Sequence, residues 1–149
     1  MKIRSLDDLK RMKAEGLSEL YPEKPKISVG TATCGLAAGA GKVLKKFREM
    51  KKALNLDVCV EESGCIGFCQ KEPLVVLYRP GHPKLVFHTM TPRKAEALCR
   101  GLQAGSFDQA DILARIPSET LLLSGECRTF SDNGDGQIAD LDSLPFYRK

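Results

Sequence analysis

The sequence lacks the features of several large functional classes. No apolar run approaches the ~20 residues that a membrane-spanning helix needs, and the first five residues lead into charged side chains instead of an apolar signal core. We therefore expect a cytoplasmic protein without a membrane span. The charge excess is small, with 23 Lys and Arg against 19 Asp and Glu. Because the basic residues are spread along the chain, we expect no nucleic-acid partner.

Histidine is equally scarce, since His82 and His88 are the only two. Neither stands at a recognisable spacing from a nucleophilic Ser or Cys and a carboxylate, so no catalytic triad is predicted. A phosphate-binding loop is also missing, because Leu36 and Val43 stand where a Walker A loop requires Gly and Ser or Thr. The chain thus offers no catalytic residue and no nucleotide site of its own. We expect no catalysis from this chain alone.

The composition is that of a soluble globular domain. Apolar residues make up 42% of the chain and charged residues 28%, which is typical of this class. A chain of 149 residues buries about two thirds of its unfolded surface, so its core is stable without disulfide bonds. In a reducing compartment the six cysteines are then metal ligands or buried thiols rather than disulfides.

Hydrophobic periodicity predicts a short N-terminal helix followed by an α/β fold. That helix begins at Ser5, with Asp8 completing a capping box, and ends near Gly16. The remaining pattern predicts strands at 26–30, 56–61, 74–78 and 84–88, a helix at 35–54, and a helix from the cap Thr91 to about residue 102. The first two strands flank a helix and should be parallel, whereas the last two form a hairpin.

These elements describe a four-stranded mixed sheet, built as a βαβ unit followed by a β-hairpin and a helix. Beyond residue 104 the signal weakens: we expect a helix at 107–116, a strand at 120–123 and a loop at 131–142. The predicted organisation is an N-terminal helix and linker at 1–25, an α/β domain at 26–104 and an irregular C-terminal extension at 105–149.

The chemistry is concentrated in two loops that carry cysteine. Cys65 and Cys69 lie with Gly64 and Gly67 between two predicted strands, in a tight loop that can aim both sulfurs at one point. Cys34 opens the helix after the first strand, where free N–H groups and the helix dipole favour the thiolate. Thiolates that accept N–H hydrogen bonds suit an iron–sulfur cluster. The remaining cysteines are expected to be buried small residues: Cys59, Cys99 and Cys127.

Both loops resemble those of thioredoxin-like [2Fe-2S] ferredoxins. The segment 64–69, Gly-Cys-Ile-Gly-Phe-Cys, with a strand starting at Pro73, is similar to their second ligand loop, and 29–40 looks like their first loop and helix. The similarity is greatest to the N-terminal domain of the flavin- and NADH-binding subunits of NADP-reducing and electron-bifurcating hydrogenases, relatives of the complex I flavin subunit. Residues 144–149 resemble the segment where that flavin domain begins, whereas 105–143 are not covered.

This resemblance implies a thioredoxin-like fold and a [2Fe-2S] cluster with Cys34, Cys65 and Cys69 as metal ligands. It implies an electron-transfer module of a multi-subunit NAD(P)H-linked oxidoreductase, which relays single electrons to or from a flavin partner. The expected partners are a flavin-containing subunit and other iron–sulfur subunits. FMN and NAD(P) would be bound only in such an attached or partner subunit.

The chain departs from this family in one ligand. The family uses two cysteines in each loop, and Val29 stands where the additional cysteine of the first loop is expected. A fourth ligand would come from Thr31 or Thr33, from a partner, or less readily from Cys59. Two other functions therefore stay open: a cluster-free docking domain of the same kind of complex, and a thiol redox protein with Cys34 as nucleophile and a thiol of the other loop as resolving group.

Overall fold

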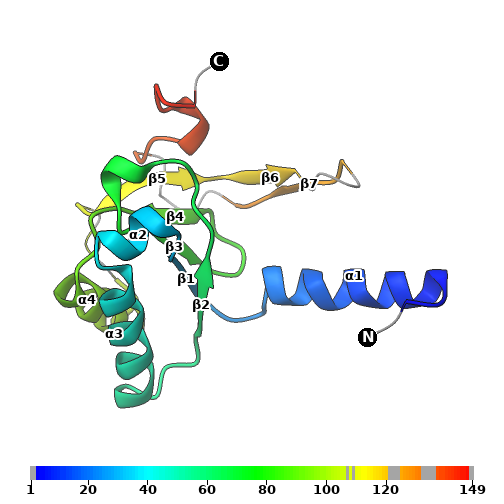
Figure 1. The fold of residues 1–149 in the computed structure, drawn as a ribbon, viewed down its shortest axis with the longest axis horizontal. Coiled ribbons are helices and arrows are strands. Elements are labelled where there is room, and N and C mark those ends of the chain that lie inside the picture. Colours follow the sequence, from blue (N-terminus) through cyan, green and yellow to red (C-terminus); the bar gives the residue numbers. More distant parts are fainter. Residues whose placement is uncertain (1–2, 107, 109, 121–124, 132–136, 148–149) are drawn as a thin grey trace.

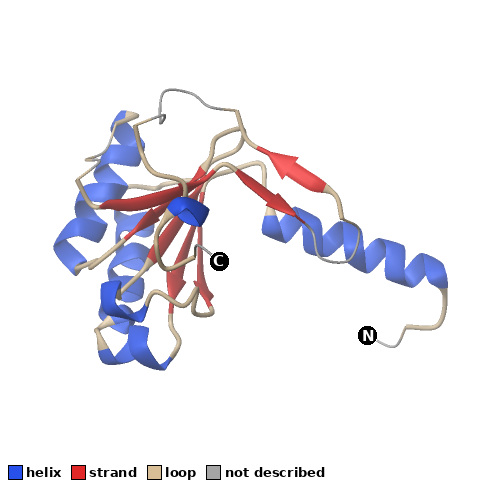
Figure 2. Ribbon diagram, turned by 90° about the horizontal axis from the view of Figure 1, so that it is seen from above, coloured by secondary structure: helices blue, strands red, loops and turns tan. Residues whose placement is uncertain are grey.

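A computed structural model describes residues 3–106, 108, 110–120, 125–131 and 137–147. Its main body is a mixed five-stranded sheet in the order β2-β1-β3-β4-β5, in which only β1 and β2 are parallel. The strands are β1 (Lys26–Gly30), β2 (Cys59–Ser63), β3 (Val75–Tyr78), β4 (Lys84–Phe87) and β5 (Ile112–Ile116). Helices α3 (Ala40–Ala53) and α4 (Pro92–Ala104) pack side by side on one face of this sheet (Figures 1 and 2).

The core lies between that face and the two helices. Ile27 and Val29 of β1 have no exposed surface, and they cluster with Phe47 of α3 and Cys99 of α4. Burial of such side chains contributes roughly 1.5–3 kcal/mol each. The alternation along β1 therefore holds the strand in one register, because a slip by one residue would turn its apolar side chains away from the helices.

The predicted βαβ unit and hairpin are confirmed, but the strand count is wrong. The sheet has five strands, because a segment predicted as a helix at 107–116 forms β5. Residues 107 and 109 lie outside the described residues. Ala114 of β5 is fully buried beside β4, where Leu85 pairs with Arg115. Pairing with an existing sheet edge overrides a weak local preference for helix.

The long helix predicted at 35–54 is interrupted. It consists of α2 (Thr33–Ala37) and α3, and Gly39 stands between them in a left-handed conformation with φ of 100°. A glycine adopts this conformation without the penalty that a Cβ atom would bring. The break lets α2 take its own direction at the edge of the sheet, next to the segment that follows β2 (Figure 1).

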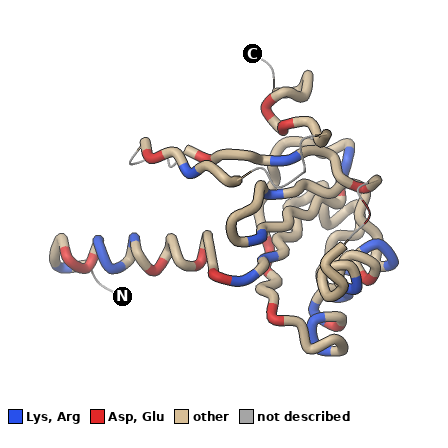
Figure 3. The backbone as a smooth tube through the Cα atoms, turned by 180° about the vertical axis from the view of Figure 1, so that it is seen from behind, with Lys and Arg blue, Asp and Glu red and all other residues tan. Residues whose placement is uncertain are grey.

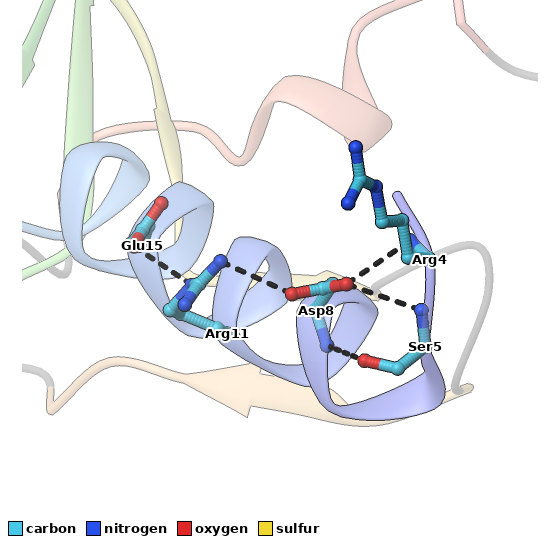
Figure 4. Close-up of polar contacts among 5 residues, drawn as sticks. All are labelled: Arg4, Ser5, Asp8, Arg11 and Glu15. Atoms are coloured by element: carbon cyan, nitrogen blue, oxygen red, sulfur yellow. Dashed lines mark hydrogen bonds and ion pairs between the residues drawn. The ribbon is translucent and has the colours of Figure 1, made fainter. Parts of the chain in front are cut away.

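Helix α1 (Leu6–Leu20) has the predicted start but ends later than expected. The Ser5 hydroxyl accepts a hydrogen bond from the Asp8 N–H, and the Asp8 carboxylate accepts from the N–H groups of Ser5 and Arg4 (Figure 4). Gly16 does not end the helix. No residue of α1 is buried, and the helix projects away from the sheet (Figure 1).

The C-terminal extension is more regular than predicted. Strands β6 (Ser118–Thr120) and β7 (Cys127–Thr129) form an antiparallel pair that extends in the same direction as α1 (Figure 1). The strand predicted at 120–123 thus overlaps β6 only at Thr120, and 121–123 lie outside the described residues. Of the loop predicted at 131–142, residues 132–136 lie outside them too. A 3-10 helix, η2 (Leu141–Ser143), follows.

The surface carries both charge signs. Acidic residues flank a basic stretch along α1, and neither sign dominates the remainder of the described backbone (Figure 3). Within the described part of the chain, every helix is too short or too polar to cross a membrane.

Candidate metal centre

The two cysteine-bearing loops leave the sheet at the same edge. Strands β1 and β2 are parallel and in register, so their last residues, Gly30 and Ser63, are paired. One residue further on, the Thr31 N–H donates to the Ser63 carbonyl at 3.0 Å. Cys34 and Cys65 therefore follow neighbouring strand ends, as the carboxyl ends of parallel strands require.

Cys65 and Cys69 form a close pair of thiols. Both are exposed, and their sulfurs lie 3.9 Å apart. A tetrahedral metal with sulfur bonds of ~2.3 Å separates two ligand sulfurs by ~3.8 Å. The Gly67 N–H donates to Cys65 Sγ at 3.1 Å, from a residue with φ of 91°. The pair thus fits two positions of one metal ion, with a backbone donor already directed at one sulfur.

Cys34 lies on the neighbouring loop. It is the second residue of α2 and is exposed. Among the residues that the structure describes, no group of three or more His, Cys, Asp and Glu side chains is close enough to hold a metal ion. The fold thus brings Cys65 and Cys69 together and puts Cys34 at the same edge. A centre with all three as ligands stays a prediction.

The alternative ligands on this chain are differently placed. Thr31 is at the correct edge, and its hydroxyl donates to Glu62 at 3.4 Å. Cys59 pairs with Lys26 at the opposite end of β2 from the cysteine loop, so it is a poor candidate for a shared site. Val29, at the position of the expected fourth cysteine, is fully buried in the core.

Glu72 lies between the two loops, and the sequence did not single it out. It follows Cys69 by three residues and is 8% exposed, and its Oε2 accepts a hydrogen bond from the Leu74 N–H at 2.6 Å. The same oxygen lies 3.5 Å from the position of a Cβ on Gly30 and 3.3 Å from one on Gly35. Its Oε1 has no hydrogen-bond partner among the described residues. The one signal in the sequence was a charged residue shortly before the apolar strand predicted at 74–78.

The remaining cysteines differ from their prediction in part. Cys99 is fully buried as expected, and burial raises the pKa of its thiol to about 11, with a further contribution from the charge of Glu96. Cys59 is only half-buried at the start of β2, and Cys127 on β7 is exposed, so both expectations of burial are corrected. All three residues of β7 are exposed, because the pair β6–β7 projects from the body (Figure 1).

Two aromatic residues near the C-terminus pack on the cysteine loop and were also missed. Phe146 and Tyr147 contact Phe68, with ring centroids 5.1 and 6.1 Å apart. The Tyr147 hydroxyl donates to the Ile66 carbonyl. Burial raises the pKa of Tyr147, and the nearby charge of Cys65 adds to this effect. No local pattern indicates such a contact, because Tyr147 and Ile66 are 81 positions apart.

Comparison with known proteins identifies the family. No protein-family model matches the chain. Over 100 residues the chain is 36% identical to the NADP-reducing hydrogenase subunit HndB of Solidesulfovibrio fructosivorans, and the alignment covers 64% of this chain and 79% of that protein. The chain belongs to the family of this hydrogenase subunit.

Solved structures confirm the fold of this HndB-family chain. A thioredoxin-like [2Fe-2S] ferredoxin from Aquifex aeolicus matches 62% of the chain and 93% of its own length, with a TM-score of 0.53 and 17% identity. A second structure, of the wild-type ferredoxin from the same organism, matches 62% of the chain and 98% of its own length, with a TM-score of 0.51 and 18% identity. The predicted thioredoxin-like fold with an N-terminal helix is therefore confirmed.

Proposed function

We propose that this HndB-family chain is an electron-transfer subunit of a multi-subunit NAD(P)H-linked hydrogenase-type oxidoreductase. In this proposal Cys34, Cys65 and Cys69 hold a [2Fe-2S] cluster, and a partner subunit carries the flavin. Such a cluster, when bound, accepts and releases one electron at a time. The chain itself supplies thiolate ligands and backbone donors and catalyses nothing alone.

One observation carries the proposal: the sulfurs of Cys65 and Cys69 are 3.9 Å apart and one of them accepts the Gly67 N–H. Hydrogen bonds from backbone N–H groups to ligand sulfurs stabilise the more negative, reduced state of a cluster. The family relationship supports the assignment to a hydrogenase complex, since the relative is a hydrogenase subunit. The fold supports the cofactor, since the matching structures are of [2Fe-2S] ferredoxins.

Anaerobic purification tests the proposal. We expect brown protein with visible absorption and about two irons per chain, as one such cluster requires. Cys65→Ser should abolish the colour and the bound iron, because it removes one thiolate of the close pair. Cys127→Ser is the matched control, since it removes an exposed thiol from β7 and should leave both unchanged.

Two outcomes would contradict the proposal. Wild-type protein that stays colourless and iron-free after anaerobic incubation with iron, sulfide and thiol would show that the loops do not hold a cluster. A reversible disulfide between Cys34 and either thiol of the other loop, found by mass spectrometry in the same metal-free sample, would favour thiol redox chemistry instead.

A second candidate, docking within the same kind of complex, is favoured by an exposed apolar groove. A groove of about 840 Å³ runs between α1, β6 and η2, and its apolar lining includes Met12, Leu17, Leu20, Ile116 and Leu141. On α1 itself Leu6 and Leu9 are exposed, and the helix buries none of its residues. A helix of 15 residues is marginal without packing. We infer that an apolar segment of another hydrogenase subunit covers this groove.

Purification of the intact complex through a tag on this chain tests the docking role. Leu9→Asp puts a charge on the apolar side of α1 and should remove the partner subunits, identified by mass spectrometry. Ser18→Asp puts the same charge on an exposed position of the opposite side and should retain them. An unchanged complex with Leu9→Asp, or a homodimer that this substitution dissociates, would refute a subunit of another kind as the occupant.

A further inference from the structure

The loop that carries Cys65 and Cys69 is held from outside by the segment at 144–147. Phe146 meets Phe68 edge to face at 5.1 Å, and Tyr147 stacks on Phe68 at 6.1 Å with an angle of 28° between the ring planes. The Tyr147 hydroxyl also donates to the Ile66 carbonyl. Ile66 and Phe68 both stand between the two cysteines, so these contacts act on the backbone that joins the thiols.

Phe146 also lies beside the residue whose N–H donates to sulfur. Its Cε1 lies 3.4 Å from the position that a Cβ on Gly67 would take, so the ring leaves room for glycine at this position. The N–H of the same Gly67 donates to Cys65 Sγ. Movement of the ring away from the loop would therefore release the residue whose backbone hydrogen bond orients the Cys65 sulfur.

The covering segment is itself anchored to the sheet. The Arg115 side chain of β5 donates to the Asp140 carboxylate at 2.6 Å, and its backbone N–H donates to the Ala139 carbonyl at 3.0 Å. From there a chain of turns continues, in which the Tyr147 N–H donates to the Leu144 carbonyl at 2.9 Å. The segment lies at the same end of the sheet as α2 (Figure 1). Strand β5 thus determines where the two rings sit.

We propose that Phe146 and Tyr147 are positioning residues, which clamp the 64–69 loop and keep Cys65 and Cys69 at the separation seen here. A loop with glycine at 64 and 67 has many accessible conformations, and fixing one of them needs contacts from elsewhere in the fold. Both sulfurs are exposed, and the clamp restricts the loop conformations in which reagents meet them. Its effect on bound iron rests on the proposed function, whereas its effect on the thiols does not.

Alkylation of the reduced, metal-free chain with iodoacetamide, followed by mass spectrometry, measures the clamp. In Phe146→Ala, alkylation of Cys65 and Cys69 relative to Cys127 should be roughly fivefold faster, the factor that corresponds to about 1 kcal/mol of lost ring contact. Tyr147→Phe keeps the ring and loses only the hydroxyl, so its effect should be in the same direction and smaller. Tyr21→Phe is the matched control, because its hydroxyl donates to Glu119 instead.

Hydrogen exchange of the 64–69 peptide gives a second readout that does not depend on thiol chemistry. It should be faster in Phe146→Ala and unchanged in Tyr21→Phe. Phe146 is 55% exposed, so we expect Phe146→Ala to fold, which circular dichroism checks, and Tyr147→Phe provides a milder variant. Unchanged alkylation and unchanged exchange in both variants would overturn the clamp.

The rate of iron release tests the clamp and the proposed cluster separately. After reconstitution with iron and sulfide, loss of iron to a chelator should be faster in Phe146→Ala than in wild type. If no variant binds iron but the alkylation rates differ as stated, the clamp stands and the cluster is refuted. If all variants bind and release iron alike and their thiols react alike, the cluster stands and the clamp is refuted.

Discussion

Cys99 differs from the thiols of the candidate centre because it has no exposed surface. It lies on the inner side of α4, within the core cluster that also contains Phe47. The thiolate would lose its hydration there, so burial raises the pKa of Cys99 from 9.0 to about 11. Cys34, Cys65 and Cys69 are all exposed at the sheet edge, where reagents and metal ions can reach them.

The burial of Cys99 predicts a loss of stability in alkaline solution. The unfolded chain loses this proton near pH 9 and the folded chain only near 11, so unfolding releases a proton between these values. The contribution of Cys99 to stability is complete below pH 9 and falls as pH rises toward 11, by roughly 1–3 kcal/mol in total. Urea unfolding at pH 8, 9 and 10 measures this dependence.

Two substitutions assign that dependence to one thiol. Cys99→Ala should be less stable at pH 8 because of the cavity it leaves, and its stability should fall less between pH 8 and 10 than that of the wild type. Cys127→Ala removes an exposed thiol and should reproduce the wild-type fall. Equal slopes for all three proteins would show that Cys99 titrates alike in the folded and unfolded chains.

Among the elements, α2 depends on an unusually close approach to β1. A Cβ on Gly35 would lie 2.2 Å from the Gly30 carbonyl oxygen and 3.3 Å from Glu72 Oε2. The first of these atoms belongs to the backbone of a central strand and cannot move alone. Gly35 is therefore what allows the helix with Cys34 to sit against the strand end, next to the loop that carries the other two thiols.

Gly35→Ala should destabilise the fold by about 3 kcal/mol, because either α2 or β1 must shift to relieve the contact. Urea denaturation of the purified chain measures the difference. Gly16→Ala is the matched control, since nothing lies within 4 Å of its added Cβ and alanine favours an exposed helix; it should not lower stability. A Gly35→Ala protein as stable as the wild type would mean that the close approach is not required.

Elements that form from local signals were predicted better than those that depend on distant partners. The cap at Ser5 and the start of α4 at Thr91 depend on side chains within three residues, and both are observed. Strand β5 exists because β4 offers an open edge more than 20 positions earlier in the chain, and no local pattern shows this. The break at Gly39 depends on one residue in a left-handed conformation. The apolar residues before and after it continue at helical spacing, so the sequence predicted one uninterrupted helix.

Across the whole molecule, the candidate centre and the apolar groove occupy different regions. The cysteine loops lie at the end of the sheet where β1 and β2 finish, whereas the groove lies between the projecting arms α1 and β6, beside η2. A cluster of Tyr21, Tyr78 and Phe130 joins these arms to the sheet. An electron-transfer site and a docking surface can therefore coexist, because neither covers the other.

By itself the sequence determined the α/β class and the parallel pairing of the first two strands, because these follow from apolar periodicity. It also determined that Cys65 and Cys69 lie close together, because the two residues are four positions apart in one glycine-containing loop. Only the tertiary structure decided the fifth strand, the placement of Glu72 between the loops, and the contact of Phe146 and Tyr147 with the cysteine loop. Each of those results from packing between segments far apart in the chain, and no local pattern records which distant surface a side chain will meet.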